Sequence, residues 1–251
     1  MKRSIILVVF LLLSFSVYAQ EPEFIVREEY AEIYIYDDAT VEIWYYLTIE
    51  TTSGPQRGIY IGIPTSDVFD FAASQNGRML KIEKETNRLK IYFSDEVQTG
   101  AITDVKVSFF VEEMIYPDEE GQSSMEFIPA WWDRQRIDVL RVKFILPEGC
   151  DISDVGHYPP TAENRGMEDG RAFVYFERAN LDPGYRFRCG VSFPDAYVIS
   201  IDEDSVQEGS EGSGIIEKTV SEFENSPTTG LIIIIGLIII GIFLWRLLHR
   251  E

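Results

Sequence analysis

The fold is decided by the stretch VEIWYYLTIE, residues 41–50, in which apolar and polar side chains alternate. One face of the stretch carries Val41, Ile43, Tyr45, Leu47 and Ile49. The other face carries Glu42, Trp44, Tyr46, Thr48 and Glu50. A period of two residues puts successive side chains on opposite faces of a β-strand. The stretch therefore predicts a half-buried antiparallel strand.

The same alternation recurs at residues 89–93, 105–111 and 185–193. Tyr36-Asp37-Asp38-Ala39, just before residue 41, is typical of a hairpin turn, and Asn76-Gly77 is a second turn signal. No segment before Ile215 shows a convincing helical period with caps. The pattern predicts an all-β fold.

The number of domains follows from where the strands are interrupted. Seven short strands before Tyr116 fit one sandwich, and the polar run Pro117–Gln122 is the best boundary. We therefore expect two consecutive antiparallel, immunoglobulin-like β-sandwich domains, at residues 20–116 and 117–201. A single continuous sandwich is the alternative. Residues 157–170, rich in Pro, Gly and charge, are expected to form a long surface loop.

The N-terminus carries a secretory pattern. Lys2 and Arg3 precede an apolar run, and Val17-Tyr18-Ala19 is a small-x-small cleavage site. Residues 1–19 are therefore predicted to be a signal peptide, and an uncleaved anchor is the other interpretation.

The C-terminal apolar run LIIIIGLIIIGIFLW occupies residues 231–245 and predicts a transmembrane helix over residues 230–248. Residues 202–229, acidic and rich in Ser and Gly, predict a flexible stalk. Residues 249–251 would form a short cytoplasmic tail. We expect a single-pass protein of the cell membrane whose N-terminal domain is extracytoplasmic.

Ser226-Pro227-Thr228-Thr229-Gly230, just before the apolar run, is similar to the sorting signal of sortase-anchored surface proteins. In those proteins a transpeptidase cuts between the Thr and the Gly. This chain has Ser226 where the usual signal has Leu. A plain stop-transfer helix is the other interpretation.

The charge of the chain excludes one class of partner. The sequence has 42 acidic and 22 basic residues and a formal net charge of −20. Such a surface repels the phosphates of nucleic acid, so we expect no nucleic-acid partner. The acidic surface also favours solubility and can attract cations or basic partners.

The sequence shows few residues suited to catalysis. His157 is the one histidine in the expected extracytoplasmic part, which disfavours a Ser/His/Asp site and a His-rich metal site there. Nucleotide-binding glycine motifs and calcium loops of the usual pattern are missing from the sequence. We expect no cofactor, no metal and, on balance, no enzymatic activity. A pair of carboxylates acting on envelope glycans is the enzymatic alternative.

Two cysteines lie in the expected extracytoplasmic part, where disulfides persist. Cys189 shares the apolar face of its strand, and Cys150 follows the turn Pro147-Glu148-Gly149. The two thiols could form a disulfide or could stay separate and buried, because sequence spacing does not reveal their separation in space.

The segment Trp131-Trp132-Asp133-Arg134 is the strongest candidate contact surface, because Trp and Arg are frequent at interface hot spots. The other interpretation is that one Trp fills a junction in the core, as large aromatic residues usually do.

Several short segments, in the same order, resemble a family of predicted membrane proteins catalogued as domain of unknown function 2207. The first is Arg57-Gly58-Ile59-Tyr60-Ile61-Gly62-Ile63-Pro64, and the second is Phe127–Asp133. Later turns, among them Asn180–Gly184, are similar as well. The resemblance implies an all-β extracytoplasmic domain on a membrane anchor, without an assigned activity. Arg57 and Tyr60 of the first segment join Trp131–Arg134 as candidate binding residues.

These patterns together favour a non-enzymatic binding or assembly module of the cell envelope. Its partners would be the membrane, through the single span, and an envelope protein whose identity the sequence does not reveal.

Overall fold

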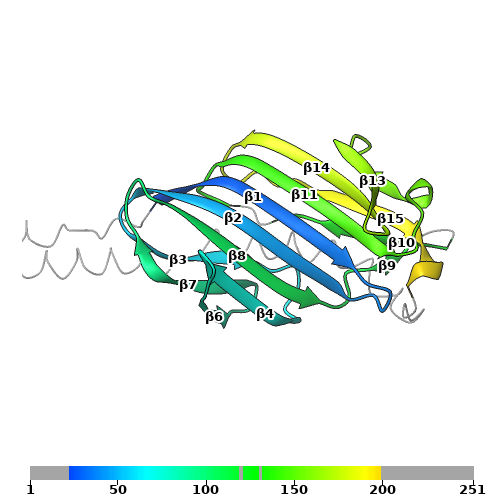
Figure 1. Cartoon of the computed structure of the whole chain (residues 1–251), viewed down its shortest axis with the longest axis horizontal. Helices are drawn as coiled ribbons and strands as arrows, with labels where there is room; N and C mark the ends of the chain where they lie inside the picture. Colours follow the sequence, from blue (N-terminus) through cyan, green and yellow to red (C-terminus); the bar gives the residue numbers. More distant parts are fainter. Residues whose placement is uncertain (1–22, 119–120, 130–131, 199–251) are drawn as a thin grey trace, which may run out of the picture. The chain divides into compact units, whose positions relative to one another are not determined.

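A computed structural model describes residues 23–118, 121–129 and 132–198 (Figure 1). These residues are mostly β-strand and contain no α-helix, which confirms the predicted all-β class. The predicted signal peptide, stalk, transmembrane helix and tail, and Ser226–Gly230, lie outside the described residues. Within the described ranges, no helix has the length and apolar character needed to cross a membrane.

The strands and short helical turns follow one another along the chain. The first eight strands are β1 (Glu23–Ile35), β2 (Val41–Ser53), β3 (Gln56–Gly62), β4 (Val68–Gln75), β5 (Arg78–Met79), β6 (Lys81–Lys84), β7 (Arg88–Val97) and β8 (Ile102–Val111). The remaining elements are β9 (Tyr116–Pro117), β10 (Gln122–Phe127), β11 (Ile137–Glu148), η2 (Ile152–Asp154), β12 (Gly156–Tyr158), β13 (Asn164–Glu168), β14 (Arg171–Leu181), β15 (Cys189–Pro194) and η3 (Asp195–Tyr197).

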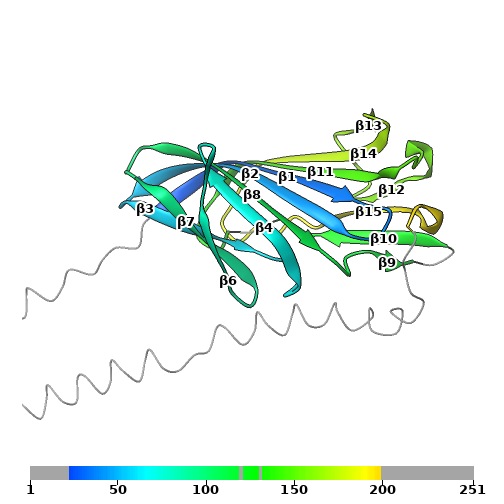
Figure 2. The ribbon, with the colours of Figure 1, turned by 60° about the horizontal axis from the view of Figure 1, so that its bottom comes forward.

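The strands form three sheets. The largest has eight strands in the order β13-β14-β11-β1-β2-β8-β4-β5. A four-stranded sheet has the order β12-β15-β10-β9, and a three-stranded sheet the order β3-β7-β6. Figures 1 and 2 show both small sheets on the same side of the eight-stranded sheet. We call the covered side of the large sheet its inner face and the other side its outer face.

The alternation along residues 41–50 sets the two faces of the large sheet. Every second side chain from Val41 to Ile49 is buried, and the residues between them are half-buried. The turn at residues 36–39 joins β1 to β2 as predicted, and Ala39 adopts a positive φ of 66° there. The inner face packs on the small sheets through aromatic contacts such as that of Tyr45 with Phe127, whose ring centroids lie 6.4 Å apart.

The strand pairing does not follow the expected division into residues 20–116 and 117–201. β11, which lies beyond the expected boundary, pairs in parallel with β1 in the middle of the large sheet. This pair also differs from the purely antiparallel arrangement that we expected. The described residues belong to one compact unit with a shared hydrophobic core.

The segment 157–170 also differs from its prediction as a loop. It contributes to β12 and forms β13, which pairs with β14 at one edge of the large sheet. Asp169 and Gly170 both have positive φ values and make the tight turn between β13 and β14. The charges and glycines of this segment therefore serve a hairpin.

Candidate binding surface

The expected contact segment 131–134 is divided between the core and the surface. Trp131 lies outside the described residues. Trp132 is only 7% exposed, and its ring meets that of Phe24 edge-on at a centroid distance of 5.4 Å. Trp132 is therefore a core residue. Asp133 and Arg134 are exposed on the connection between β10 and β11.

Arg57 and Tyr60 lie on a different element, the edge strand β3 of the three-stranded sheet. Gly58 lets β3 approach β7 closely, because a Cβ atom at this position would lie 2.2 Å from the carbonyl oxygen of Ile91. Gly62 has no such neighbour within 4 Å. The structure thus does not bring Arg57 and Tyr60 onto the strand connection that holds Asp133 and Arg134.

A row of alternating cations and rings covers the solvent side of the three-stranded sheet. The guanidinium of Arg88 lies 4.1 Å from the ring centroid of Tyr60, and the ammonium of Lys90 lies 5.8 Å from the same ring. Lys90 and Lys81 each lie 4.9 Å from the ring centroid of Tyr92. We call these five residues the cation–aromatic ladder.

The strand register explains how the ladder forms. Tyr60 pairs with Lys90 across β3 and β7, and Tyr92 pairs with Lys81 across β7 and β6. Leu89 and Ile91, between the ladder residues of β7, point into the core. The alternation at residues 88–92 predicts a strand, but it does not reveal that Lys81, Arg88, Lys90 and Tyr92 lie on one surface with Tyr60, because that depends on the pairing of three strands.

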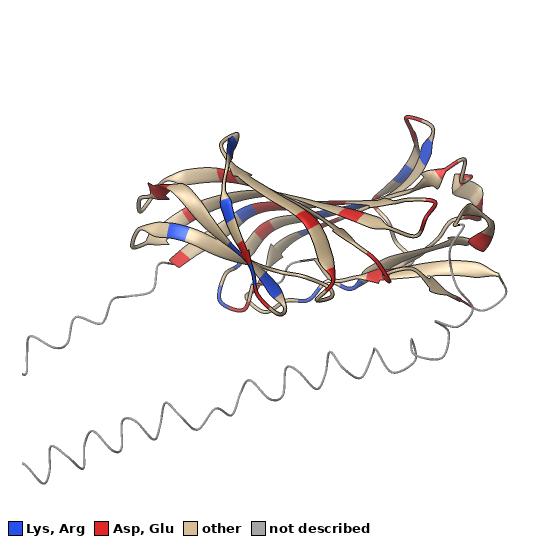
Figure 3. Ribbon diagram, turned by 90° about the horizontal axis from the view of Figure 1, so that it is seen from below, with Lys and Arg blue, Asp and Glu red and all other residues tan. Residues whose placement is uncertain are grey.

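The ladder is exposed to solvent, and the segment that contains it has a higher proportion of basic residues than the whole chain. Tyr60 is 43% exposed. Residues 56–97 contain six basic and six acidic residues, whereas the whole chain has 22 and 42. Figure 3 marks the basic and acidic positions along the described ribbon. Lys81 and Arg88 bond to Glu83 and Glu85, each at 2.6 Å. Lys90 has no carboxylate within ion-pair distance among the described residues.

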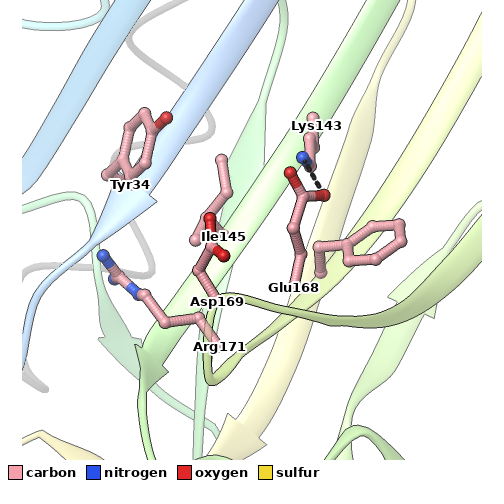
Figure 4. A pocket seen from close by; sticks show the side chains of 7 residues that line it. Tyr34, Lys143, Ile145, Glu168, Asp169 and Arg171 are labelled. Carbon is pink, nitrogen blue, oxygen red and sulfur yellow. Dashed lines mark hydrogen bonds and ion pairs between the residues drawn. The ribbon is translucent and has the colours of Figure 1, made fainter.

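A small cavity of about 90 Å³ opens at another place, beside the β13–β14 turn on the outer face of the large sheet (Figure 4). Its lining includes Lys143, which bonds to Glu168 at 2.6 Å, and Arg171. The Arg171 guanidinium donates to the backbone carbonyls of Leu146 and Ile35. The cavity is large enough for a few water molecules.

The carboxyl group with a raised pKa lies elsewhere. Glu29 is completely buried on the inner face, and this burial raises its pKa to about 8 despite a hydrogen bond from Trp132. Glu29 does not line the cavity, so these two features do not combine into the pair of acids that a glycan hydrolase needs. Among the described residues, no group of three His, Cys, Asp or Glu side chains is arranged to hold a metal ion.

Cys150 and Cys189 are both buried free thiols, so the disulfide is absent from the structure. Cys189 approaches the carbonyl oxygen of Phe127 at 3.5 Å, and Cys150 approaches that of Asp151 at 3.9 Å. Burial raises the pKa of Cys150 to about 11 and also raises the pKa of Cys189. Both residues therefore behave as protonated core side chains.

Comparison with known proteins shows a likeness in fold. No family model and no curated protein sequence matches the chain, so the resemblance to domain of unknown function 2207 stays a prediction. The M1 zinc metallopeptidase from Deinococcus radiodurans is similar in structure, with a TM-score of 0.51 and 12% identity over 68% of this chain and 42% of that one. Legionella pneumophila aminopeptidase A gives a TM-score of 0.50 and 13% identity over 71% of this chain and 22% of that one. The chain spans less than half the length of these proteins, and at such identities the likeness shows a shared β-fold.

Proposed function

We propose that this protein is a non-enzymatic binding or assembly module of the cell envelope. A signal peptide would export it, and a single C-terminal span would hold its β-sandwich outside the cytoplasm. The cation–aromatic ladder would bind an envelope protein that presents acidic side chains. The peptidase activity named for the structural neighbours is not part of this proposal, because the similarity to them is one of fold.

The observation that carries the proposal is the exposed ring of Tyr60 between Arg88 and Lys90. Tyr and Arg are both enriched at interface hot spots. Tyr buries much area there at a small cost in side-chain entropy. Lys90 supplies a positive charge that has no carboxylate within ion-pair distance among the described residues. The positive charges of the ladder would attract an acidic partner, whereas the rest of the acidic molecule would repel it. This difference would also steer the partner toward the ladder during the encounter.

The test is crosslinking in intact membranes followed by purification of the full-length protein. The wild type is compared with the double variant Tyr60→Ala/Lys90→Ala. Tyr185→Ala is the matched control, because Tyr185 is 45% exposed and lies outside the ladder. We expect the same crosslinked partner with the wild type and the control, and its loss with the double variant. Equal recovery from the double variant, or no partner from any membrane, would refute the proposal.

A further inference from the structure

The outer face of the eight-stranded sheet is a second surface, separate from the ladder, and it is rich in aromatic side chains. Tyr46 stacks between its neighbours Tyr30 and Trp44, at centroid distances of 5.7 and 6.3 Å. Phe110 of β8 stacks with Phe69 of β4 at 5.7 Å. The rings are half-buried by one another. Aromatic side chains on such a face offer much contact area to a partner.

Four carboxylates of the outer face have cationic partners in the same sheet. Arg141 bonds to one carboxylate on each side of its strand, and Arg27 bonds to two more near the start of β1. The four carboxylates neutralised in this way are Glu28, Glu177, Glu50 and Asp138.

Glu32, at the centre of the face, is held by hydroxyl groups. It accepts hydrogen bonds from Tyr30, Tyr46 and Tyr34 at 2.8, 3.2 and 3.3 Å. Desolvation and the charge of Glu32 raise the pKa of Tyr46 to about 12, so its hydroxyl group stays protonated and donates. Glu42 accepts a similar bond from Tyr36 at 2.8 Å.

These bonds decide what kind of partner the face suits. Covering a carboxylate costs free energy chiefly when the carboxylate loses water without another donor in place. The carboxylates described above keep donors from their own sheet, so a partner can cover them without supplying cations. The face therefore favours a broad, largely aromatic partner over a strongly basic one.

The outer face carries both positive and negative side chains that have no ion-pair partner among the described residues. Among the described residues, Lys106 and Arg171 have no carboxylate partner, and Glu32 and Glu42 have no Lys or Arg partner. A second copy of the same face, related by a twofold axis, would offer both signs in return. An acidic or basic partner would complement only one of them.

The size of the face also suits a second copy. Six neighbouring strands, β14 to β4, at ~4.8 Å spacing and about eight residues in length, make a patch of roughly 700 Å². A stable interface of standard size buries about 800 Å² on each partner. The face is thus close to what a dimer needs.

We propose that the outer face of the eight-stranded sheet is a homodimer interface, on which a second copy of this chain packs face to face. Trp44, Tyr46 and Phe110 form the aromatic centre, and Lys106 lies beside it as an exposed residue that meets a carboxylate of the other copy. The interface is independent of the ladder, so one copy can pair with another and bind an envelope protein at the same time.

The experiment measures the mass of the detergent-solubilised full-length chain by light scattering on a sizing column. The variants are Lys106→Glu and Trp44→Arg, and Lys90→Glu in the ladder is the matched control. We expect a dimer for the wild type and for Lys90→Glu, and a monomer for Lys106→Glu and Trp44→Arg. A monomeric wild type, or dimers of unchanged stability in both outer-face variants, would overturn the proposal.

Lys106→Glu guards against misfolding, because Lys106 is an exposed side chain whereas Trp44 is half-buried. Its circular dichroism spectrum should match that of the wild type.

The binding proposal for the ladder and the dimer proposal for the outer face can be refuted independently of each other. Lys90→Glu would lose the crosslinked envelope partner but keep the dimer, and Lys106→Glu would do the reverse. Loss of both properties in either variant would refute the independence of the two surfaces.

Discussion

Trp132 donates its indole N–H to the carboxyl group of Glu29 at 2.8 Å, and both side chains lie in the core. The other carboxyl oxygen of Glu29 has no hydrogen-bond partner in the structure. Burial disfavours the charged form of this group, which raises its pKa from 4.5 to about 8. The Glu29 carboxyl group therefore stays protonated and neutral near neutral pH, on the inner face of the large sheet.

This arrangement predicts how stability depends on pH. Between pH 4.5 and about 8 the unfolded chain has lost the proton of Glu29 while the folded chain keeps it. The free energy of unfolding therefore falls as pH rises through this window, by about 1 kcal/mol per pH unit from this group, and levels off above it. Below pH 4.5 the full contribution is present.

The variant Glu29→Gln isolates this contribution, because an amide of the same shape does not titrate. Urea midpoints of both proteins are measured from pH 5 to 8.5. The wild-type midpoint should fall as pH rises, so the midpoint of Glu29→Gln should approach the wild-type midpoint or exceed it. The difference between the two proteins should change by a few kcal/mol across the window. A constant difference would mean that Glu29 does not titrate there.

Trp132 itself can be tested by graded truncation. Trp132→Phe keeps a ring against Phe24 but leaves the Glu29 carboxyl without its donor, so we expect a loss of about 1–3 kcal/mol in the free energy of unfolding. Trp132→Ala also leaves a cavity, for a loss of about 3–5 kcal/mol. Replacing Asp133, the exposed neighbour, by Ala is the control. A neutral Trp132→Ala would contradict the core position.

A local sequence pattern predicts a single strand, but it does not predict which distant strand becomes its neighbour. Residues 41–50 carry their own period, and the buried set in β2 followed it. The parallel pairing of β1 with β11 joins residues more than 100 positions apart, and no local pattern records which strands become neighbours. The division into two sandwiches failed to match the pairing for this reason, since a polar break at residue 117 looks the same in either topology.

Glu29 follows the alternation of β1, although a register shift lies close to it. The shift between Val26 and Glu28 brings Val26 onto the inner face, where Glu29 also lies. Reading backwards from Ile35, Ile33 and Ala31 would have placed Glu29 on the apolar face of β1. The ladder needed strand register as well as alternation, because its cations and rings come from three strands.

The free thiols predict insensitivity to reducing agents. Cys150 and Cys189 are unbridged, so the melting temperature with and without a reductant should agree. Burial and raised pKa values should make both thiols slow to alkylate in the folded protein and fast in urea. Mass spectrometry of alkylated protein would count the modified sites. A melting temperature lowered by reductant would show a disulfide that the structure lacks.

Gly58 and Gly62 offer a matched pair on one edge strand. Gly58→Ala places a Cβ atom 2.2 Å from the carbonyl oxygen of Ile91, so β3 has to move away from β7. We expect a loss of about 2 kcal/mol or more in the free energy of unfolding, as for other overpacked sites. Gly62→Ala meets nothing within 4 Å and should change stability by about 0.5 kcal/mol or less.

Because the ladder spans β3 and β7, Gly58→Ala should also weaken crosslinking to the envelope partner, whereas Gly62→Ala should leave it intact. Equal effects of the two substitutions would contradict the close approach of the strands, and with it the geometry on which the ladder depends.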